Sequence, residues 1–196
     1  ERWNNNFDYY QTLTGLQNGV YELKAQAFYR TGSNADAWSQ HTSETEEILA
    51  WIYINDNKAA VPSIMEYPRT EAELAKGVAN DGQLSTVTGN CYSPGSNDDG
   101  VTIYTPNGQN SASAFFSIGD YECNVYGIVT DGNLRLGIKS EGSVSDRWTL
   151  FDNFRLVFQG YNEDVLVDLL NAKSEEAAEL LESTMAKDAF NALEEA

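Results

Sequence analysis

The sequence is poor in basic residues, and this shortage excludes partners that need them. Its 196 residues contain 12 Lys and Arg against 30 Asp and Glu, so the formal net charge is -18 and the pI is near 4.2. Such a chain repels phosphate backbones and anionic lipid surfaces. We therefore expect no nucleic-acid partner, and we interpret the acidity mainly as a source of solubility.

Long apolar runs and catalytic motifs are also missing. Because no run of about 18 apolar residues is present, we expect no membrane insertion. The chain has a single histidine, and it contains no GxSxG, HExxH or phosphate-binding loop. A glycosidase needs only two carboxylates about 5 to 10 Å apart, so an enzyme remains a third interpretation behind two non-catalytic ones.

Cysteine is scarce as well, with only Cys91 and Cys123 present. We expect the two to come close enough to pair, because the segment that carries Cys91 must return to the sheet just before the strand that carries Cys123. Such a bridge needs an oxidising compartment. A chain with 41% hydrophobic and 12% aromatic residues does not depend on it to form a core.

The sequence does have many short segments in which apolar and polar residues alternate, as in the strands of a half-buried sheet. Residues 7–13 and 20–30 flank an Asn18-Gly19 turn signal, and we expect these two segments to pair antiparallel. One face of 20–30 is apolar, and its other face could meet water or a ligand. Further strands are predicted at 48–55, 101–105, 111–117, 121–130, 134–139 and 148–160.

Two polar stretches interrupt these strands. Residues 31–47 are predicted to form a long loop that carries Trp38, and residues 56–100 form a long insertion with a short helix from Thr70. Trp38 would either pack on the edge of the sheet or present its ring to a ligand. Near the end of the insertion, the four residues from Asn97 are predicted to form a turn.

The segment 148–160, WTLFDNFRLVFQG, is expected to close the sheet. Alternation places Asp152 in an otherwise apolar row between Leu150 and Phe154. A buried carboxylate there would need backbone amides, a cation or a metal as its partner. We therefore expect Asp152 inside the sheet packing, near the N-terminal segment.

After Gly160 the apolar spacing becomes helical. Asn162 could cap a first short helix, and a break at Ser183-Thr184 separates it from a second. We expect residues 1–160 to be one domain and residues 161–196 to be a helical tail, either docked on that domain or opening a truncated helical bundle. The chain begins without Met, which suggests a mature or excised fragment.

Three stretches, residues 11–30, 104–139 and 148–160, resemble the galactose-binding-like jelly-roll modules of secreted and surface proteins of gut Bacteroidetes. The tail resembles the small helical spacer modules that follow such domains. The resemblance implies a mostly β fold, an antiparallel jelly-roll β-sandwich of about eight strands with a short C-terminal α-helical segment. It also implies a secreted, periplasmic or cell-surface location, but it does not name a ligand.

The wider group of sandwich carbohydrate-binding modules often holds a structural calcium between an aspartate of the final strand and an acid near the N-terminus. The resemblance therefore implies that Asp152 could hold calcium, with Asp8 or Glu1 as its partner. The alternative is a carboxylate held by backbone amides, and no cofactor is then required.

The leading functional hypothesis is a non-catalytic carbohydrate-binding module that takes an oligo- or polysaccharide through aromatic stacking and hydrogen bonds. The alternative is a structural spacer that contacts neighbouring domains of the same polypeptide and binds no glycan. For a glycan, the candidate ligand-binding residues are Trp38, Tyr92, Tyr67, Arg30 and Asn97.

Overall fold

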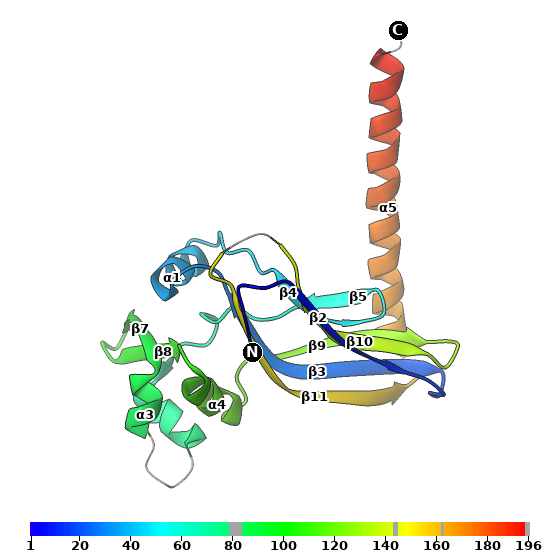
Figure 1. The fold of residues 1–196 in the computed structure, drawn as a ribbon. Helices are drawn as coiled ribbons and strands as arrows, with labels where there is room; N and C mark the ends of the chain where they lie inside the picture. The colour runs from blue at the N-terminus through cyan, green and yellow to red at the C-terminus, as the bar shows by residue number, and fades with distance from the viewer. Residues whose placement is uncertain (79–83, 143–144, 162, 195–196) are drawn as a thin grey trace.

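The computed structural model describes residues 1–78, 84–142, 145–161 and 163–194, with side chains described as far as residue 181. Within these ranges the chain is mostly β, with two four-stranded antiparallel sheets, a three-stranded sheet and a long C-terminal helix (Figure 1). None of the described helices is long and apolar enough to span a membrane.

The first sheet has the strand order β1-β11-β3-β9. Its strands are β1 (Arg2–Trp3), β11 (Trp148–Gly160), β3 (Gly19–Arg30) and β9 (Glu122–Val129). The apolar face predicted for β3 is confirmed, because five of its side chains are buried in the core. These are Tyr21, Leu23, Ala25, Ala27 and Tyr29.

The second sheet has the strand order β2-β10-β4-β5. Its strands are β2 (Phe7–Leu13), β10 (Leu134–Ser140), β4 (Ala50–Ile54) and β5 (Asn57–Ala60). The expected pairing of β2 with β3 is wrong, because β2 pairs with β10 along its whole length while β3 belongs to the other sheet. The Asn18-Gly19 segment therefore connects the two sheets.

The inner faces of the two sheets pack against each other and form the larger hydrophobic core, so the arrangement is sandwich-like. This core joins β3 and β9 of one sheet to β4 and β10 of the other. Gly127 on β9 shows how closely the sheets approach, since a Cβ atom there would stand 2.1 Å from Ile54 Cγ2. Only glycine fits at that point without movement of the neighbouring strand.

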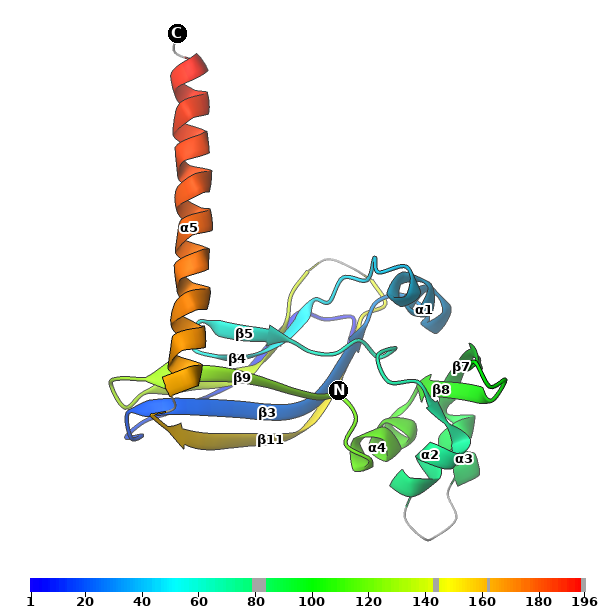
Figure 2. The same ribbon diagram turned by 180° about the vertical axis from the view of Figure 1, so that it is seen from behind.

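A second lobe lies at one end of the sandwich (Figures 1 and 2). Its core packs on Phe28, Trp148 and Leu150, which face outward from the first sheet. The outer face of β3 is therefore mostly covered by protein rather than by water. The lobe contains α1 (Asn34–Thr42), β6 (Arg69–Thr70), α2 (Glu71–Leu74), η1 (Ala75–Gly77), α3 (Leu84–Gly89), β7 (Cys91–Ser96), β8 (Thr102–Pro106) and α4 (Gln109–Ser117).

Two of the sequence predictions for this lobe are confirmed. The short helix of residues 71–74 starts after Thr70, whose hydroxyl accepts a hydrogen bond from the Glu73 amide in a capping box. Asn97 makes the predicted turn, and its Oδ1 atom accepts from the amides of Asp99 (3.2 Å) and Val101 (2.9 Å).

Three other predictions for the lobe are wrong. Residues 31–47 are not a loop throughout, because Ser33 and Asp36 form a capping box that starts α1. Residues 111–117 form the helix α4 instead of a strand, since Ala112 and Phe115 have helical spacing and are buried in the second core. Residues 91–96 of the insertion 56–100, where no strand was predicted, form β7.

Alternation in β11 breaks at a bulge between Asp152 and Arg155, where Asn153 has a φ of 57°. Phe151 and Leu156 consequently pack on the same core. In a regular strand, two residues separated by an odd number of positions would point to opposite faces. Asp152 precedes the bulge and lies on the same outward face of β11 as Leu150. Its carboxylate is exposed, so the expectation that it lies inside the sandwich is wrong.

The two cysteines do not form the expected disulfide, and both thiols are free. Cys91 lies at the fringe of the second core, whereas Cys123 is buried in the first. Each thiol donates to a backbone carbonyl instead, Cys91 to Val87 at 3.2 Å and Cys123 to Ala25 at 3.6 Å.

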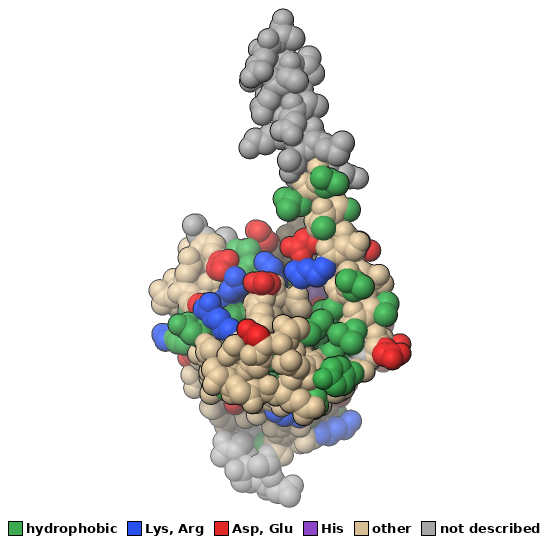
Figure 3. All heavy atoms as spheres, turned by 90° about the vertical axis from the view of Figure 1, so that its right-hand side faces the viewer, with side chains coloured by type: hydrophobic (Ala, Val, Ile, Leu, Met, Phe, Trp, Pro, Cys, Tyr) green, Lys and Arg blue, Asp and Glu red, His purple; other side chains and the backbone are tan. Residues whose placement is uncertain are grey.

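The tail is one helix, α5 (Glu163–Glu194), and not the two short helices that were expected with a break at Ser183-Thr184. The predicted cap at Asn162 lies outside the described residues. The base of α5 meets the sandwich, where Leu166 and Leu169 are half-buried. The helix then projects away from it (Figures 1 and 2). Figure 3 shows hydrophobic side chains gathered around this base, beside a group of charged ones.

Candidate functional site

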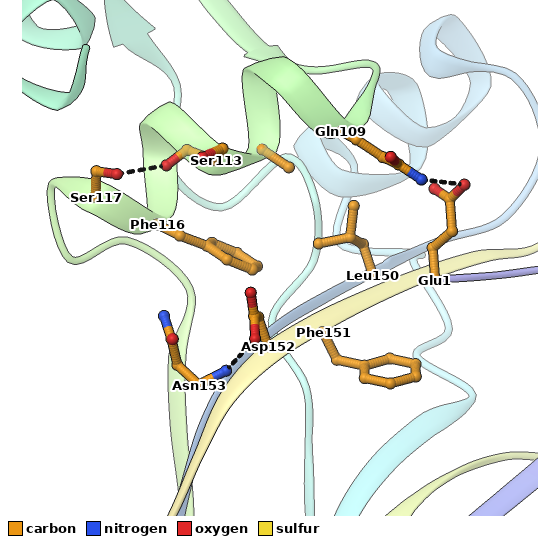
Figure 4. A pocket seen from close by; sticks show the side chains of 10 residues that line it. Glu1, Gln109, Ser113, Phe116, Ser117, Leu150, Phe151, Asp152 and Asn153 are labelled. Atoms are coloured by element: carbon orange, nitrogen blue, oxygen red, sulfur yellow. Dashed lines mark hydrogen bonds between the residues drawn. The ribbon is translucent and has the colours of Figure 1, made fainter. Parts of the chain in front are cut away.

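A hollow of about 460 Å³ lies between α4 and β11, where the second lobe meets the first sheet (Figure 4). We call it the α4–β11 hollow. Its lining combines an N-terminal residue, one face of α4 and the bulge of β11. The side chains that matter for its chemistry are Glu1, Gln109, Ser113, Phe116, Ser117, Asp152 and Asn153.

Helix α4 presents Gln109, Ser113, Phe116 and Ser117 to the hollow, a spacing that places all four on one face of a helix. The start of this helix is held by Ser111. Its Oγ atom accepts from the Gly108 amide at 3.2 Å and donates to the Asn90 carbonyl at 2.7 Å. The wall of the hollow is therefore anchored to the core of the second lobe.

The opposite wall is fixed by Gln26, a buried amide on β3. Its Nε2 atom donates to the carbonyls of Phe116 (2.8 Å) and Asp120 (2.9 Å), and its Oε1 atom accepts from the Asn153 side-chain amide. Asp152 in turn accepts from the Asn153 backbone amide at 2.8 Å. One buried side chain thus ties the bulge of β11 to the end of α4.

The N-terminal end of the hollow is closed by Glu1. Its two carboxylate oxygens accept from Gln109 Nε2 at 2.7 Å and from Trp148 Nε1 at 3.0 Å. Beside it, Trp3 is 46% exposed, and its ring centroid lies 6.3 Å from that of Trp148. Burial lowers the pKa of Arg30. The Arg30 guanidinium lies 5.3 Å from the centroid of the Trp3 ring and supports this ring. Trp3 is therefore an exposed aromatic surface on a rigid support.

The side chains of the hollow are mostly polar, and none of them carries a positive charge. Two carboxylates, two amides and two hydroxyls surround the ring of Phe116, and neither Lys nor Arg is among the lining residues. Carboxylates accept hydrogen bonds, while amides and hydroxyls both donate and accept. This arrangement suits a neutral ligand with many hydroxyl groups, and it disfavours an anion.

The structure places the predicted ligand-binding aromatics elsewhere. Trp38 lies on α1, half-buried against the second core, with its ring 6.4 Å from that of His41. Tyr67 and Tyr92 are also partly buried against that core. All three help to build the lobe, and none of them lines the α4–β11 hollow.

The two polar candidates also lie outside the hollow. Arg30 is buried beneath Trp3 and Trp148, so it supports the rim instead of contacting the hollow directly. Asn97 occupies the exposed turn between β7 and β8. None of the five predicted residues therefore lines the α4–β11 hollow.

Two of the three predicted metal ligands, Glu1 and Asp152, line the hollow. Asp8 lies on the second sheet, where it accepts from Tyr53 Oη at 2.6 Å and Arg135 Nη2 at 2.7 Å. Calcium takes six to eight oxygen ligands, whereas both Glu1 oxygens already accept hydrogen bonds. No group of three His, Cys, Asp or Glu that could hold a metal occurs among the described residues. These residues do not fit a calcium ion.

Sequence reasoning missed Gln109, Phe116, Asn153 and Trp3. The signal for the first two was the spacing of Ala112, Phe115 and Phe116, which fits a helix although the segment was read as a strand. No local pattern marked the Asn153 bulge, because it depends on the contact with Gln26 across the sheet.

Comparison with known proteins adds no assignment to this geometry. No family model matches the chain, and neither a curated protein nor a solved structure matches it.

Proposed function

We propose that the chain is a non-catalytic carbohydrate-binding module whose ligand lies in the α4–β11 hollow. The observation that carries the proposal is the composition of this hollow, in which hydrogen-bonding side chains, none of them positively charged, lie around the ring of Phe116. Sugars need these two features, donors and acceptors for hydroxyl groups and an aromatic face for the apolar side of the ring. Trp3 offers a second aromatic face at the Glu1 end.

The sheet topology supports this class of protein. We propose that the two sheets form a jelly roll, because each carries early and late strands side by side, in the orders β1-β11-β3-β9 and β2-β10-β4-β5. The resemblance to galactose-binding-like modules suggests in addition a secreted, periplasmic or cell-surface location.

The affinity for a glycan is proposed to be weak, roughly micromolar to millimolar. The ligand would gain one or two stacked rings and hydrogen bonds near solvent. Little net binding free energy remains after the cost of ordering the ligand. No metal ion is proposed to be required, since both Glu1 oxygens already accept hydrogen bonds from Gln109 and Trp148.

A glycan-array screen of the full chain, with and without calcium, tests the proposal. We expect neutral oligosaccharides to bind, and we expect binding to survive excess EDTA. Asp152→Ala should lower the affinity at least about tenfold, the cost of one lost hydrogen bond to a charged group. Asp99→Ala, in an exposed turn remote from the hollow, is the control and should bind normally. Equal affinity of the two variants would contradict the assignment.

A second candidate function, the structural spacer, is favoured by α5. Its described side chains from residue 171 to 181 are exposed, and they include Leu180 and Leu181. A helix that presents apolar residues in this way is suited to contact a neighbouring domain. A chain that binds no glycan but associates through α5 would support the spacer.

A further inference from the structure

Strand β2 forms one edge of the second sheet, and most of its side chains are exposed (Figure 1). The other edge of this sheet, β5, has four residues and lies against β9, where the Asn57 side chain donates to the Tyr126 carbonyl at 3.1 Å. β2 has seven residues, and Tyr10 at its centre is 60% exposed. A long exposed edge strand is a template for pairing with another chain.

The pairing within the sheet shows which backbone groups of β2 point to this edge. In an antiparallel sheet, successive residues of a strand hydrogen-bond alternately to its two neighbours. The Asn55 amide, at the end of β4, donates to the Arg135 carbonyl at 2.7 Å. The odd-numbered residues of β10 therefore bond toward β4, and the even-numbered ones bond toward β2. Their partners on β2 are Phe7, Tyr9, Gln11 and Leu13.

The amides and carbonyls of Asp8, Tyr10 and Thr12 consequently point away from the sheet. Gly137 on β10 gives an independent check, because a Cβ atom there would collide with the Tyr9 carbonyl oxygen, which therefore faces β10. Within the described residues, no hydrogen bond joins the outward amides and carbonyls to another group. They form a row of donors and acceptors along the edge.

β2 also lacks the features that protect edge strands from association. Its seven residues include no Lys, Pro or Gly, and its pairing with β10 has no bulge. The one charged residue is Asp8, which accepts from Arg135 Nη2 at 2.7 Å. The nearby cation Arg2 lies over the Tyr9 ring, with its guanidinium 4.8 Å from the ring centroid. The charge on β2 itself is therefore neutralised within the chain.

We propose that β2 pairs antiparallel with β2 of a second copy of this chain, about a two-fold axis at Tyr10. In this register Tyr10 faces Tyr10 of the second copy, and Asp8 and Thr12 face each other. Every outward amide and carbonyl of both strands then has a partner. A shift by two residues would leave one outward residue of each strand without a partner in β2. This self-complementary register favours a second copy over an unrelated strand.

The side chains agree with this register. Phe7 faces Leu13 of the second copy at both ends, so apolar residues meet. On the exposed face, Asp8 lies between Lys139 of its own copy and, beyond one threonine, Arg135 of the second copy. Opposite charges thus alternate across the junction, and no like charges face each other.

The association is expected to be weak. Each copy contributes one strand of seven residues, and small interfaces are typical of transient complexes, so we expect a Kd of roughly 10 to 100 μM. Each chain carries a net charge of -18, and salt that screens this repulsion should strengthen the dimer. No residue of β2 lines the α4–β11 hollow, so dimerisation and glycan binding can fail independently.

Sedimentation velocity of the full chain, from about 5 to about 500 μM, tests the proposal. We expect the average mass to rise with concentration from the monomer value of 21.7 kDa toward twice that value. It should rise further when sodium chloride increases from about 0.1 to about 0.5 M. A chain that remains monomeric throughout would overturn the proposal, and the edge would then be open only to a strand of another protein.

Thr12→Asp places an acid opposite Asp8 of the second copy and beside Arg135 of its own copy. The fold should be kept, as circular dichroism can verify, while Kd should rise about tenfold. Thr102→Asp makes the same change at an exposed strand position of the second lobe and should leave Kd unchanged. Equal effects of the two substitutions on Kd would contradict an interface at β2.

Tyr10→Cys tests the register. Residues of a hydrogen-bonded pair lie about 5.5 Å apart at Cα, within reach of a disulfide, so this variant should form a covalent dimer in a glutathione redox buffer. Gln11→Cys is the control, because Gln11 faces Tyr9 of the second copy and not itself. Non-reducing electrophoresis measures both. Covalent dimers that form equally in the two variants, or in neither, would contradict a two-fold axis at Tyr10.

Discussion

Among single residues, Gln26 contributes most to the candidate site although it does not line it. This one buried amide joins β3, the β11 bulge and the end of α4 through three hydrogen bonds. In the sequence it reads as an ordinary polar position of an alternating strand. Its role depends on residues about 90 and 127 positions away, so no local pattern could reveal it.

The cysteines give a prediction at the same scale. Burial raises the pKa of Cys91 to about 11 and that of Cys123 to about 12. Because only the thiolate reacts, we expect both thiols to react with Ellman's reagent at pH 8 at least about tenfold more slowly in the native protein than in urea. Reducing agents should leave the melting temperature unchanged. Rapid labelling of the native chain, or a lower melting temperature on reduction, would contradict the free-thiol structure.

Glu22 gives a prediction about pH. Burial alone would raise its pKa, but hydrogen bonds from Tyr126, Lys24 and Asn124 outweigh burial and hold the pKa below the ordinary value of 4.5. A lowered pKa in the folded state means that the ionised group stabilises the fold above about pH 4.5, and that this stability is lost as the pH falls through the folded pKa.

Glu22→Gln should therefore reduce the free energy of unfolding most at pH 7, and the difference from the wild type should shrink below pH 4.5. Urea titrations from pH 7 to pH 3 measure this difference. A difference that stays constant over the whole range would show that the Glu22 carboxylate has no special environment.

At the scale of elements, the bounds of several strands could be predicted, but their partners could not. Alternation located β2, β3 and β10 almost to the residue, because each has one face in the larger core. The same pattern could not assign β2 and β3 to different sheets, since pairing depends on contacts distant in sequence. The small residues of α4 are compatible with a strand or with a helix. Burial of Ala112 and Phe115 against the second core favours the helix.

The β11 bulge is the element on which the site depends, and Asn153 is the residue that permits it. A β-branched residue at φ 57° is strained, so Asn153→Val should lower the free energy of unfolding by about 2 kcal/mol. Asn153→Gly keeps the backbone conformation and should cost less. Chemical denaturation of both variants measures the costs. Equal stability of Asn153→Val and the wild type would mean that the bulge is not strained as described.

For the whole molecule, the sandwich follows from sequence patterns, whereas the hollow follows from the assembly of distant segments. Residues 1, 109–117 and 150–153 line it together, and no two of these segments are adjacent in the chain. The aromatic residues predicted to bind a ligand, Trp38, Tyr67 and Tyr92, instead pack against the core of the second lobe. A polar loop can thus fold into a lobe when its few aromatics cluster.

The tail supplies a prediction at this scale. Its described side chains from residue 171 onward are exposed, so removal of residues 178–196 should change the melting temperature of the sandwich by less than about 2 °C. Leu166→Asp, which places a charge at the half-buried base of α5, is the comparison and should reduce the helical circular dichroism signal. A truncation that lowers the melting temperature by more than about 5 °C would show that α5 stabilises the sandwich along more than its base.

The central claim, a glycan in the α4–β11 hollow, is tested most directly by titrating ¹⁵N-labelled protein with the best neutral oligosaccharide from the array screen and recording amide and indole shifts. We expect saturable shifts of the Gln109 and Asn153 side-chain amides and of the Trp148 indole, with the Trp38 indole unchanged. Shifts confined to Trp38, Tyr67 and Tyr92, with Gln109 and Asn153 unmoved, would contradict it.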